Sequence, residues 1–278
     1  MLRRLDNPWG IDLWLLVSDI RQPHLGGNKY YKLLGYLETA RTERKQHLIT
    51  MAGAHSNHLR AFAALTRQHG LKATAIIRGD ELSDESRQSA EIRFARTLGV
   101  ECIFVTRALY RLLREADTTT GRTALFPGVD FGSAVFVPEG GLGLPGITGV
   151  QCWAAAAQGF ETVWLAVATG TTAAGFLTAT QAPTRVAGVA VLKNAAAIRE
   201  NIRRLVPLDA TRFDLIEGFE SGFGRASATL AALAADFSAR WQTTIDTTYL
   251  AKVIQALSES ARQGKVSGKT LVVYTYNE

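Results

Sequence analysis

The chain has 278 residues, 47% of them hydrophobic and 20% charged, a composition typical of a globular protein with one large or two modest domains. Its net charge of +6 does not indicate a nucleic-acid partner, because the basic residues are scattered at spacings typical of solvated helix faces. Two cysteines are too few for a disulfide framework, and the five histidines offer no helical metal pair. We therefore expect no metal site and a reducing, cytoplasmic location.

No segment of the sequence predicts membrane insertion. The first residues lack the continuous apolar core of a signal peptide. Between Gly140 and Thr184 the only charged residue is Glu161, but glycines, threonines and Pro145 interrupt the run. A membrane span needs about 20 predominantly apolar residues. The sequence favours a buried core that is interrupted by a functional loop.

In chain order, β-rich runs alternate with helical runs. Strands are predicted over residues 12–18, 48–53, 72–78, 100–106, 162–168, 185–192 and 269–275. Helices are predicted over 32–44, 59–69, 85–98 and 195–205, with one more after the loop at 168–175. This alternation with short loops predicts an α/β fold whose parallel sheets are flanked by helices. Sites in such sheets lie at the carboxyl ends of the strands.

The first candidate site begins at Gly26 and Gly27, which allow a tight turn and close backbone approach just before a predicted helix. Lys29 and Lys32 follow, three residues apart and therefore on one helix face. A lysine at the edge of a buried cleft can have a lowered pKa and form a Schiff base. Taken alone, the spacing is more typical of a pair of solvated lysines.

The second candidate is the segment from Met51 to His58, between a predicted strand and a predicted helix. Ser56 could carry a proton or act as a nucleophile, and Asn57 could donate a hydrogen bond. The alternative is that Ser56 or Asn57 caps the helix, since both residue types are favoured there. A serine hydrolase is disfavoured because no G-x-S-x-G motif surrounds Ser56.

The third candidate is a loop of small residues between a predicted strand and helix, containing Thr169, Gly170, Thr171 and Thr172. Small residues expose backbone N–H groups at a helix N-terminus, which is a natural site for a phosphate. The threonine hydroxyls would add donors. The loop matches neither the G-x-G-x-x-G dinucleotide fingerprint nor a P-loop, which disfavours a nucleotide-binding oxidoreductase.

Together these segments resemble the fold-type II pyridoxal 5′-phosphate (PLP) enzymes, in particular the D-cysteine desulfhydrase and 1-aminocyclopropane-1-carboxylate (ACC) deaminase family. The resemblance lies in four ordered segments: HLGGNKYYKLLGYL at 24–37, GAHSNHLRAFAAL at 53–65, PEGGLG at 138–143 and ATGTTAAG at 168–175. It extends over nearly the whole chain. It implies a two-domain, tryptophan-synthase-β-like fold, with a large domain of residues 1–34 and 128–278 and a small domain of residues 35–127.

The resemblance also implies the roles of single residues. By position, Lys29 matches the Schiff-base lysine and Lys32 a second lysine of the cofactor site. Ser56 matches the active-site serine, Asn57 the residue beside the PLP ring oxygen, and His58 the third residue of the substrate segment. The implied phosphate loop comprises Thr169, Gly170, Thr171 and Thr172. Tyr249 matches the active-site tyrosine, and Thr275 a partner of the pyridine nitrogen.

The carboxyl-terminal part departs from the family pattern. Leu250 follows Tyr249 where ACC deaminases carry a glutamate, which favours D-cysteine over ACC as substrate. Arg225 stands where a second tyrosine is expected, and the chain ends Tyr276-Asn277-Glu278 where the family continues through two glycines.

Three functions therefore remain open. The first is D-cysteine desulfhydrase-like β-elimination, giving pyruvate, ammonia and sulfide. The second is ACC deamination to 2-oxobutyrate and ammonia. The third, suggested by Arg225 and the altered end, is a catalytically impaired PLP-binding or ligand-binding homologue. The resemblance also implies a homodimer that acts on a small amino acid.

Overall fold

The computed structural model describes residues 1–18, 27–218 and 226–275. The chain folds into two compact units, residues 1–21 with 150–278 and residues 22–149. The division expected from the sequence instead assigns residues 22–34 and 128–149 to the larger domain. These residues belong to the other unit because helix α1 packs against β6, and β6 pairs with β3 in that unit's sheet.

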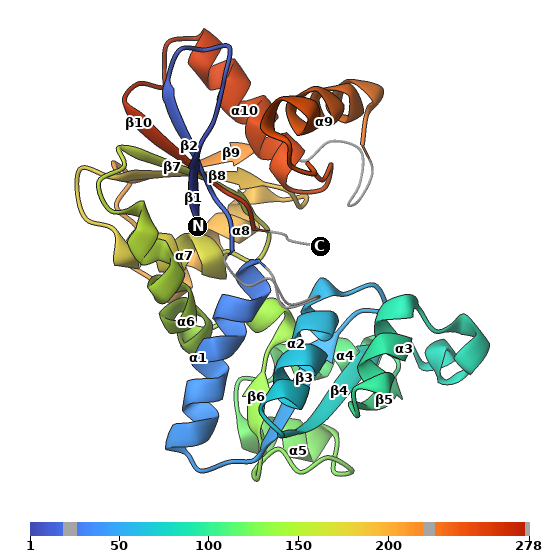
Figure 1. The fold of residues 1–278 in the computed structure, drawn as a ribbon. Coiled ribbons are helices and arrows are strands. Elements are labelled where there is room, and N and C mark those ends of the chain that lie inside the picture. The colour runs from blue at the N-terminus through green and yellow to red at the C-terminus, as the bar shows by residue number, and fades with distance from the viewer. Residues whose placement is uncertain (19–26, 219–225, 276–278) are drawn as a thin grey trace. The chain divides into compact units, whose positions relative to one another are not determined.

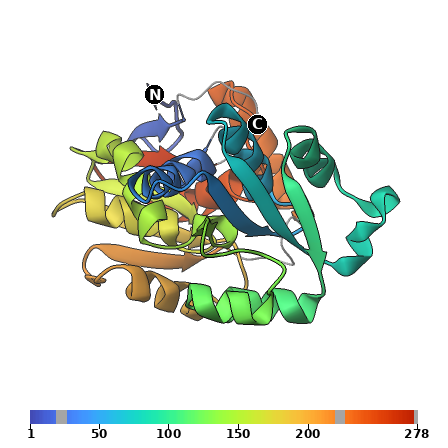
Figure 2. The ribbon, with the colours of Figure 1, turned by 90° about the horizontal axis from the view of Figure 1, so that it is seen from below.

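The unit of residues 22–149 is built on a four-stranded sheet of order β5-β4-β3-β6, in which all neighbours are parallel. Figure 2 shows β3, β4 and β5 side by side, in dark blue, teal and green. The strands are β3 (His47–Ala52), β4 (Lys72–Arg78), β5 (Glu101–Val105) and β6 (Val135–Val137). The helices are α1 (Asn28–Thr42), α2 (Asn57–Gln68), α3 (Ala90–Thr97), α4 (Arg107–Glu115) and α5 (Thr119–Leu125), with short 3-10 turns at Asp80–Ser83, Glu85–Arg87 and Glu139–Gly141.

The unit of residues 1–21 and 150–278 contains a six-stranded sheet of order β1-β2-β10-β7-β8-β9, visible in the upper part of Figure 1. Only the β1–β2 pair is antiparallel; the other four pairs are parallel. The strands are β1 (Leu2–Arg4), β2 (Asp12–Leu16), β7 (Thr162–Val167), β8 (Arg185–Ala190), β9 (Phe213–Glu217) and β10 (Lys269–Val273). The helices are α7 (Thr171–Ala179), α8 (Ala195–Leu205), α9 (Ala228–Trp241) and α10 (Leu250–Arg262), with a 3-10 turn at Ala155–Ala157, and α6 (Leu144–Ala154) contains the boundary between the units.

Helices cover these sheets because the strands are apolar along nearly their whole length. In β7, Val163 to Val167 are all buried, as expected for a parallel strand covered on both faces. Alternate strand residues such as Trp164 and Val189 pack with residues of α9 and α10 in one core. The α/β fold with parallel sheets flanked by helices, predicted from the sequence, is confirmed.

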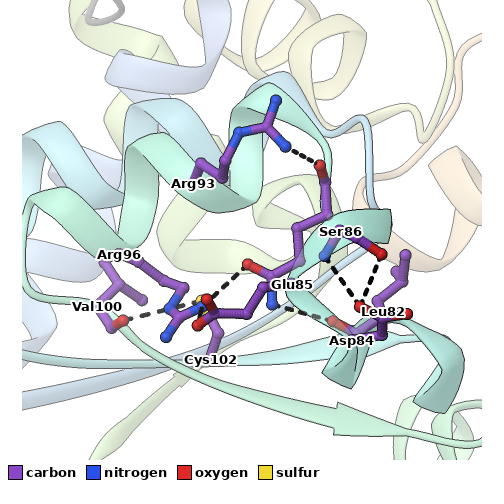
Figure 3. A network of polar contacts seen from close by, with 9 residues as sticks. Leu82, Asp84, Glu85, Ser86, Arg93, Arg96, Val100 and Cys102 are labelled. Carbon is purple, nitrogen blue, oxygen red and sulfur yellow. Dashed lines mark hydrogen bonds and ion pairs between the residues drawn. The ribbon is translucent and has the colours of Figure 1, made fainter.

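The predicted helix over 85–98 is partly wrong, because its first turn is a separate structure. Asp84 caps a short 3-10 turn, and Ser89 then accepts a hydrogen bond from the Ile92 backbone N–H, so that α3 begins only at Ala90. A polar network, drawn in Figure 3, ties this turn to α3. In it, Arg96 donates to the carboxylate of Glu85 at 2.7 Å.

No helix among the described residues combines the length and the apolar character that crossing a bilayer requires.

Candidate functional site

Helix α1 begins directly at the first candidate lysine. Gly27 precedes the helix with φ 78° and ψ −169°, a conformation that is essentially restricted to glycine. Asn28 is the first helical residue, and its Oδ1 accepts a hydrogen bond from Lys29 Nζ at 3.2 Å. Lys32, one turn later, is only 2% exposed, and its Nζ donates to the Gly140 carbonyl at 3.3 Å. The two lysines therefore differ: Lys29 keeps part of its surface accessible, while Lys32 is enclosed.

Burial sets the charge of both amines. It lowers the pKa of Lys29 from 10.5 to about 8, so about a tenth of this amine is neutral at pH 7. The pKa of Lys32 is also well below its usual value, first because of burial and then because of the positive charge of Lys29. A neutral amine is the form that attacks a carbonyl carbon. Lys29 is thus suited to bond covalently to an aldehyde.

The loop after β3 presents Ser56 and Asn57. Ser56 occupies the N-cap position of α2 with extended backbone angles, but its hydroxyl makes no capping hydrogen bond. The hydroxyl is half-buried and remains available for another partner, so capping does not account for this serine. The Ala54 carbonyl in this loop accepts a hydrogen bond from the Ser89 hydroxyl, which ties the loop to the start of α3.

His58 faces the protein interior. It is 2% exposed, and its Nε2 lies 2.8 Å from the hydroxyl of Thr50 on β3. Burial, followed by the charges of Lys29 and Lys32, lowers the pKa of His58 to about 3, so the ring is neutral at physiological pH. Since the side chain is enclosed, any contact of this residue with a substrate would come from its backbone.

The Gly/Thr loop joins β7 to α7 in the other unit. Gly170 adopts φ 98°, and a Cβ there would lie 2.5 Å from the Ile202 side chain, so both conformation and space require glycine. Thr171 and Thr172 begin α7 and are buried. Within the described part of the chain, the buried hydroxyl of Thr171 has no hydrogen-bond partner. An unsatisfied hydroxyl beside a helix N-terminus fits a phosphate group.

Thr275 lies at the same edge of this sheet as the Gly/Thr loop. It follows β10, which pairs in parallel with β7 and places Val273 opposite Leu165. The carboxyl ends of both strands therefore meet, with Thr275 beyond one and Thr169 beyond the other. Thr275 is 7% exposed.

Tyr249 marks the start of α10. The carboxylate of Asp246, a residue to which the sequence interpretation assigned no role, holds the backbone there. Asp246 Oδ1 accepts hydrogen bonds from the backbone N–H groups of Thr248 and Tyr249, and its Oδ2 accepts one from Leu250. Burial raises the pKa of Asp246, although these hydrogen bonds oppose the rise. An aspartate just before a predicted helix is a start signal that could have been recognised in the sequence.

The structure thus groups the predicted residues within each unit. In residues 22–149, Lys29 and the Ser56–Asn57 loop lie at the starts of α1 and α2, two helices that are in contact. The other unit gathers the Gly/Thr loop and Thr275 at one sheet edge. Arg225 and residues 276–278 lie outside the described residues. Sequence reasoning missed Thr50, whose hydroxyl orients His58, since no motif marks a strand threonine.

Comparison with known proteins supports the resemblance. No family model matches the chain. A Pyrococcus horikoshii protein named "Putative 1-aminocyclopropane-1-carboxylate deaminase" is 22% identical over an alignment 286 positions long, which covers 96% of this chain and 84% of that protein. The solved structure of an ACC deaminase homologue has a TM-score of 0.77 at 21% identity, covering 99% of this chain and 88% of that chain. Threonine deaminase isoform 2 from Solanum lycopersicum has a TM-score of 0.64 at 16% identity, covering 97% and 75%.

The chain therefore has the fold of the ACC deaminase homologue and of threonine deaminase. The resemblance to the ACC deaminase family predicted from the sequence is confirmed, because the relative and the structure with the higher TM-score both carry that family's name.

Proposed function

We propose that this chain is a PLP-dependent lyase or deaminase of small amino acids that bonds the cofactor through Lys29. The observation that carries the proposal is the state of Lys29: a partly exposed residue at the start of α1 whose amine has its pKa lowered by burial to about 8. The names of the relatives agree with it, since they describe deaminases.

The residues present fit the cofactor. Lys29 would hold its aldehyde, and the phosphate loop from Thr169 to Thr172 would hold its phosphate, where the Thr171 hydroxyl lacks a partner among the described groups. Thr275 would contact the pyridine nitrogen, and Asn57 the ring oxygen. When bound, PLP supplies an electron sink for charge that develops at the substrate Cα.

The chain's own groups would then move protons and orient the substrate. Lys29 would take or return the proton at the substrate Cα, because its amine would lie where the cofactor is attached. Ser56, whose hydroxyl is not used for capping, and Tyr249, held at the start of α10, are the proposed partners in proton transfer. The Ser56–Asn57 loop would bind the substrate.

We further propose D-cysteine as the preferred substrate, cleaved to pyruvate, ammonia and hydrogen sulfide. Leu250 is 1% exposed and packs in the core with residues of α9 and α10. The carboxylate that ACC deaminases carry after the tyrosine is thus replaced by a side chain that serves packing. Ring opening of ACC, which we connect with that carboxylate, is the second candidate.

A turnover screen tests the proposal. Purified protein with added PLP is incubated with D-cysteine, L-cysteine, ACC and D-serine, and keto acid and sulfide are measured. We expect pyruvate and sulfide in equal amounts from D-cysteine and little 2-oxobutyrate from ACC. The Lys29→Ala variant should form neither product. Binding of PLP without turnover of any substrate would contradict the proposed activity and select the impaired homologue.

The expected homodimer is a separate proposal. Light scattering coupled to size-exclusion chromatography measures it, and a mass of one chain would contradict it.

A further inference from the structure

The loop between β3 and α2 places Ser56, but the usual capping bond does not hold it. Ser56 stands at the N-cap position of α2, where a serine hydroxyl ordinarily accepts from a backbone N–H and fixes the entry into the helix. Here the Ser56 hydroxyl makes no such bond. In the described part of the chain, Ala54 and His55 make no hydrogen bond to another backbone group. A hold on these two residues must therefore come from side chains.

Ser89, the N-cap residue of α3, supplies such a contact. Its hydroxyl donates to the Ala54 carbonyl and accepts from the Ile92 backbone N–H at 3.2 Å. A hydroxyl has one proton and two lone pairs, so this single atom can join the loop to the start of α3. Ser89 is buried, which limits the competition of water for either bond.

The start of α3 is itself fixed by the network of Figure 3. Arg96, in the last turn of α3, donates to the carboxylate of Glu85 at 2.7 Å and to the side-chain oxygen of Gln88 at 3.0 Å. Gln88 is buried and donates in turn to the Leu82 carbonyl at 3.0 Å. The residue directly before Ser89 is thus tied both to α3 and to the 3-10 turn at Asp80–Ser83. Ser89 therefore has a fixed position from which to hold the loop.

Glu91, in the first turn of α3, is a second contact with the loop. Its carboxylate lies 3.5 Å from His55 Nδ1 and 3.4 Å from a guanidinium nitrogen of Arg60 on α2. Burial raises the pKa of Glu91, but hydrogen bonds from its own backbone N–H and from Ser89, together with nearby positive charges, lower it below its usual value. Glu91 is therefore a second acceptor within reach of the Ser89 hydroxyl, and the two acceptors have to be distinguished.

We propose that Ser89 is a positioning residue that holds Ser56 in place through the Ala54 carbonyl. Because α3 fixes the loop, Ser56 does not have to cap α2, and its hydroxyl stays available for proton transfer. The part played by Ser56 in catalysis rests on the proposed function. The hold of Ser89 on the loop does not, and it is measured without cofactor or substrate.

The backbone amide of His55 reports on the loop by NMR of the full-length protein labelled with ¹⁵N-histidine, and its signal is assigned by its loss in His55→Gln. Its order parameter should be about 0.85, as in a rigid backbone, and should fall below about 0.6 in Ser89→Ala. Ser89→Thr keeps the hydroxyl and should restore the rigid value. His47, in β3, is the internal control and should stay rigid throughout. A His55 amide that is flexible in the wild type, or equally rigid in Ser89→Ala because the proton serves Glu91, would overturn the proposal.

Thr106→Ala separates the hold on the loop from the loss of a helix cap. The Thr106 hydroxyl accepts from the Leu109 backbone N–H at 3.2 Å at the start of α4, as the Ser89 hydroxyl does from Ile92 at the start of α3. Loss of this cap should leave the His55 amide rigid, and equal loosening in both variants would contradict the proposal. If Ser89→Ala does not fold, Ser89→Gly takes its place, because glycine is well accepted at an N-cap.

Kinetics with D-cysteine tests the consequence for catalysis. Ser89→Ala should lower kcat about tenfold, because a displaced proton donor is costly, while Ser89→Thr and Thr106→Ala should stay within about twofold of the wild type. In a Ser56→Ala background, Ser89→Ala should lower kcat by less than about twofold, since both changes act through one hydroxyl. Full additivity of the two changes would refute the positioning role. A wild type without turnover would refute the proposed function alone, and the order parameter of His55 would still decide whether Ser89 holds the loop.

Discussion

Lys29 differs from an ordinary surface lysine in the environment of its amine. Partial exposure gives a reactant access, while burial lowers its pKa to about 8. A lysine in water has a pKa of about 10.4 and is almost entirely protonated at neutral pH. Because the pKa of Lys29 is lower than that of a lysine in water, the reaction of its amine with an aldehyde should have a different pH dependence, which can be measured.

We predict that the rate of bonding between Lys29 and added PLP rises about tenfold from pH 7 to pH 9 and then levels off, because the neutral fraction of an amine of pKa about 8 saturates there. Stopped-flow absorbance measures the rate. The Lys29→Met protein reports the background from other lysines. A rate that continues to rise steeply above pH 10 would show an unperturbed amine.

His58 makes a second prediction at the residue scale, for stability in acid. Its pKa is about 3 in the folded protein and about 6.5 when unfolded, so between these values the unfolded chain binds a proton that the folded chain does not. The stability due to this residue is therefore full above about pH 6.5 and falls by about 1.4 kcal/mol per pH unit below it.

Urea unfolding at pH 7 and pH 5 measures this slope. His58→Gln should lose about 2 kcal/mol less than the wild type over that interval, because glutamine does not titrate. His55→Gln is the control, since this ring is 85% exposed. Equal losses in the wild type and His58→Gln would mean that the ring is not held neutral.

At the scale of elements, α10 depends on one carboxylate for its start. Asp246 accepts three backbone N–H groups, including that of Tyr249. We predict that Asp246→Ala destabilises the protein by about 0.5–2 kcal/mol, comparable to the cost of a lost N-cap, because three backbone N–H groups at the helix start lose their acceptor. It should also lower kcat by displacing Tyr249. Urea unfolding and the keto-acid assay measure the two effects. The exposed Asp236 of α9 provides the control variant Asp236→Ala, and equal effects of both variants would contradict the capping role.

Helix α1 is positioned by close backbone contact with α6. A Cβ on Gly35 would lie 1.7 Å from the Pro145 carbonyl oxygen, and one on Gly149 would lie 2.0 Å from that of Tyr31. Neither obstacle is a flexible side chain, so the helices themselves would have to separate. The two glycines thus set the distance between α6 and α1, the helix that carries Lys29.

We predict that Gly35→Ala destabilises the protein by roughly 3 kcal/mol, the upper part of the range for overpacked sites. It should also weaken the bonding of PLP, because α1 must move. Gly128→Ala is the control, since a Cβ there meets only Phe126 at 4.0 Å. Thermal unfolding and PLP titration measure both. A Gly35→Ala protein as stable as Gly128→Ala would contradict the close packing.

Long periodic elements could be predicted from the sequence, and short or capped ones could not. The strand over 72–78 and the helix over 195–205 match the structure residue for residue. Strand β6 has three residues, which are too few to show a hydrophobic period. Because β6 was not predicted, residues 128–149 were assigned to the wrong unit. The start of α3 depends on the capping hydrogen bond that Ser89 accepts, and hydrophobic periodicity does not reveal such a bond.

For the whole molecule, the ordered motifs of the sequence lie at the ends of parallel strands and the starts of helices, where the βα alternation predicted them. Lys29 and the Gly/Thr loop could be located because glycines and small residues mark such positions. The buried hydrogen bonds of Lys32, Thr50 and His58 could not, since they join elements that are distant in sequence. Motifs locate a site, whereas its supporting contacts require the fold.

The most direct measurement for the whole account is to reduce the PLP-treated protein with borohydride and map the modified peptide by mass spectrometry. Reduction makes the bond between lysine and cofactor permanent. The account predicts one modified residue, Lys29, with Lys32 unmodified, and no modification in Lys29→Ala. A cofactor found on another lysine, or no cofactor bound at all, would contradict it.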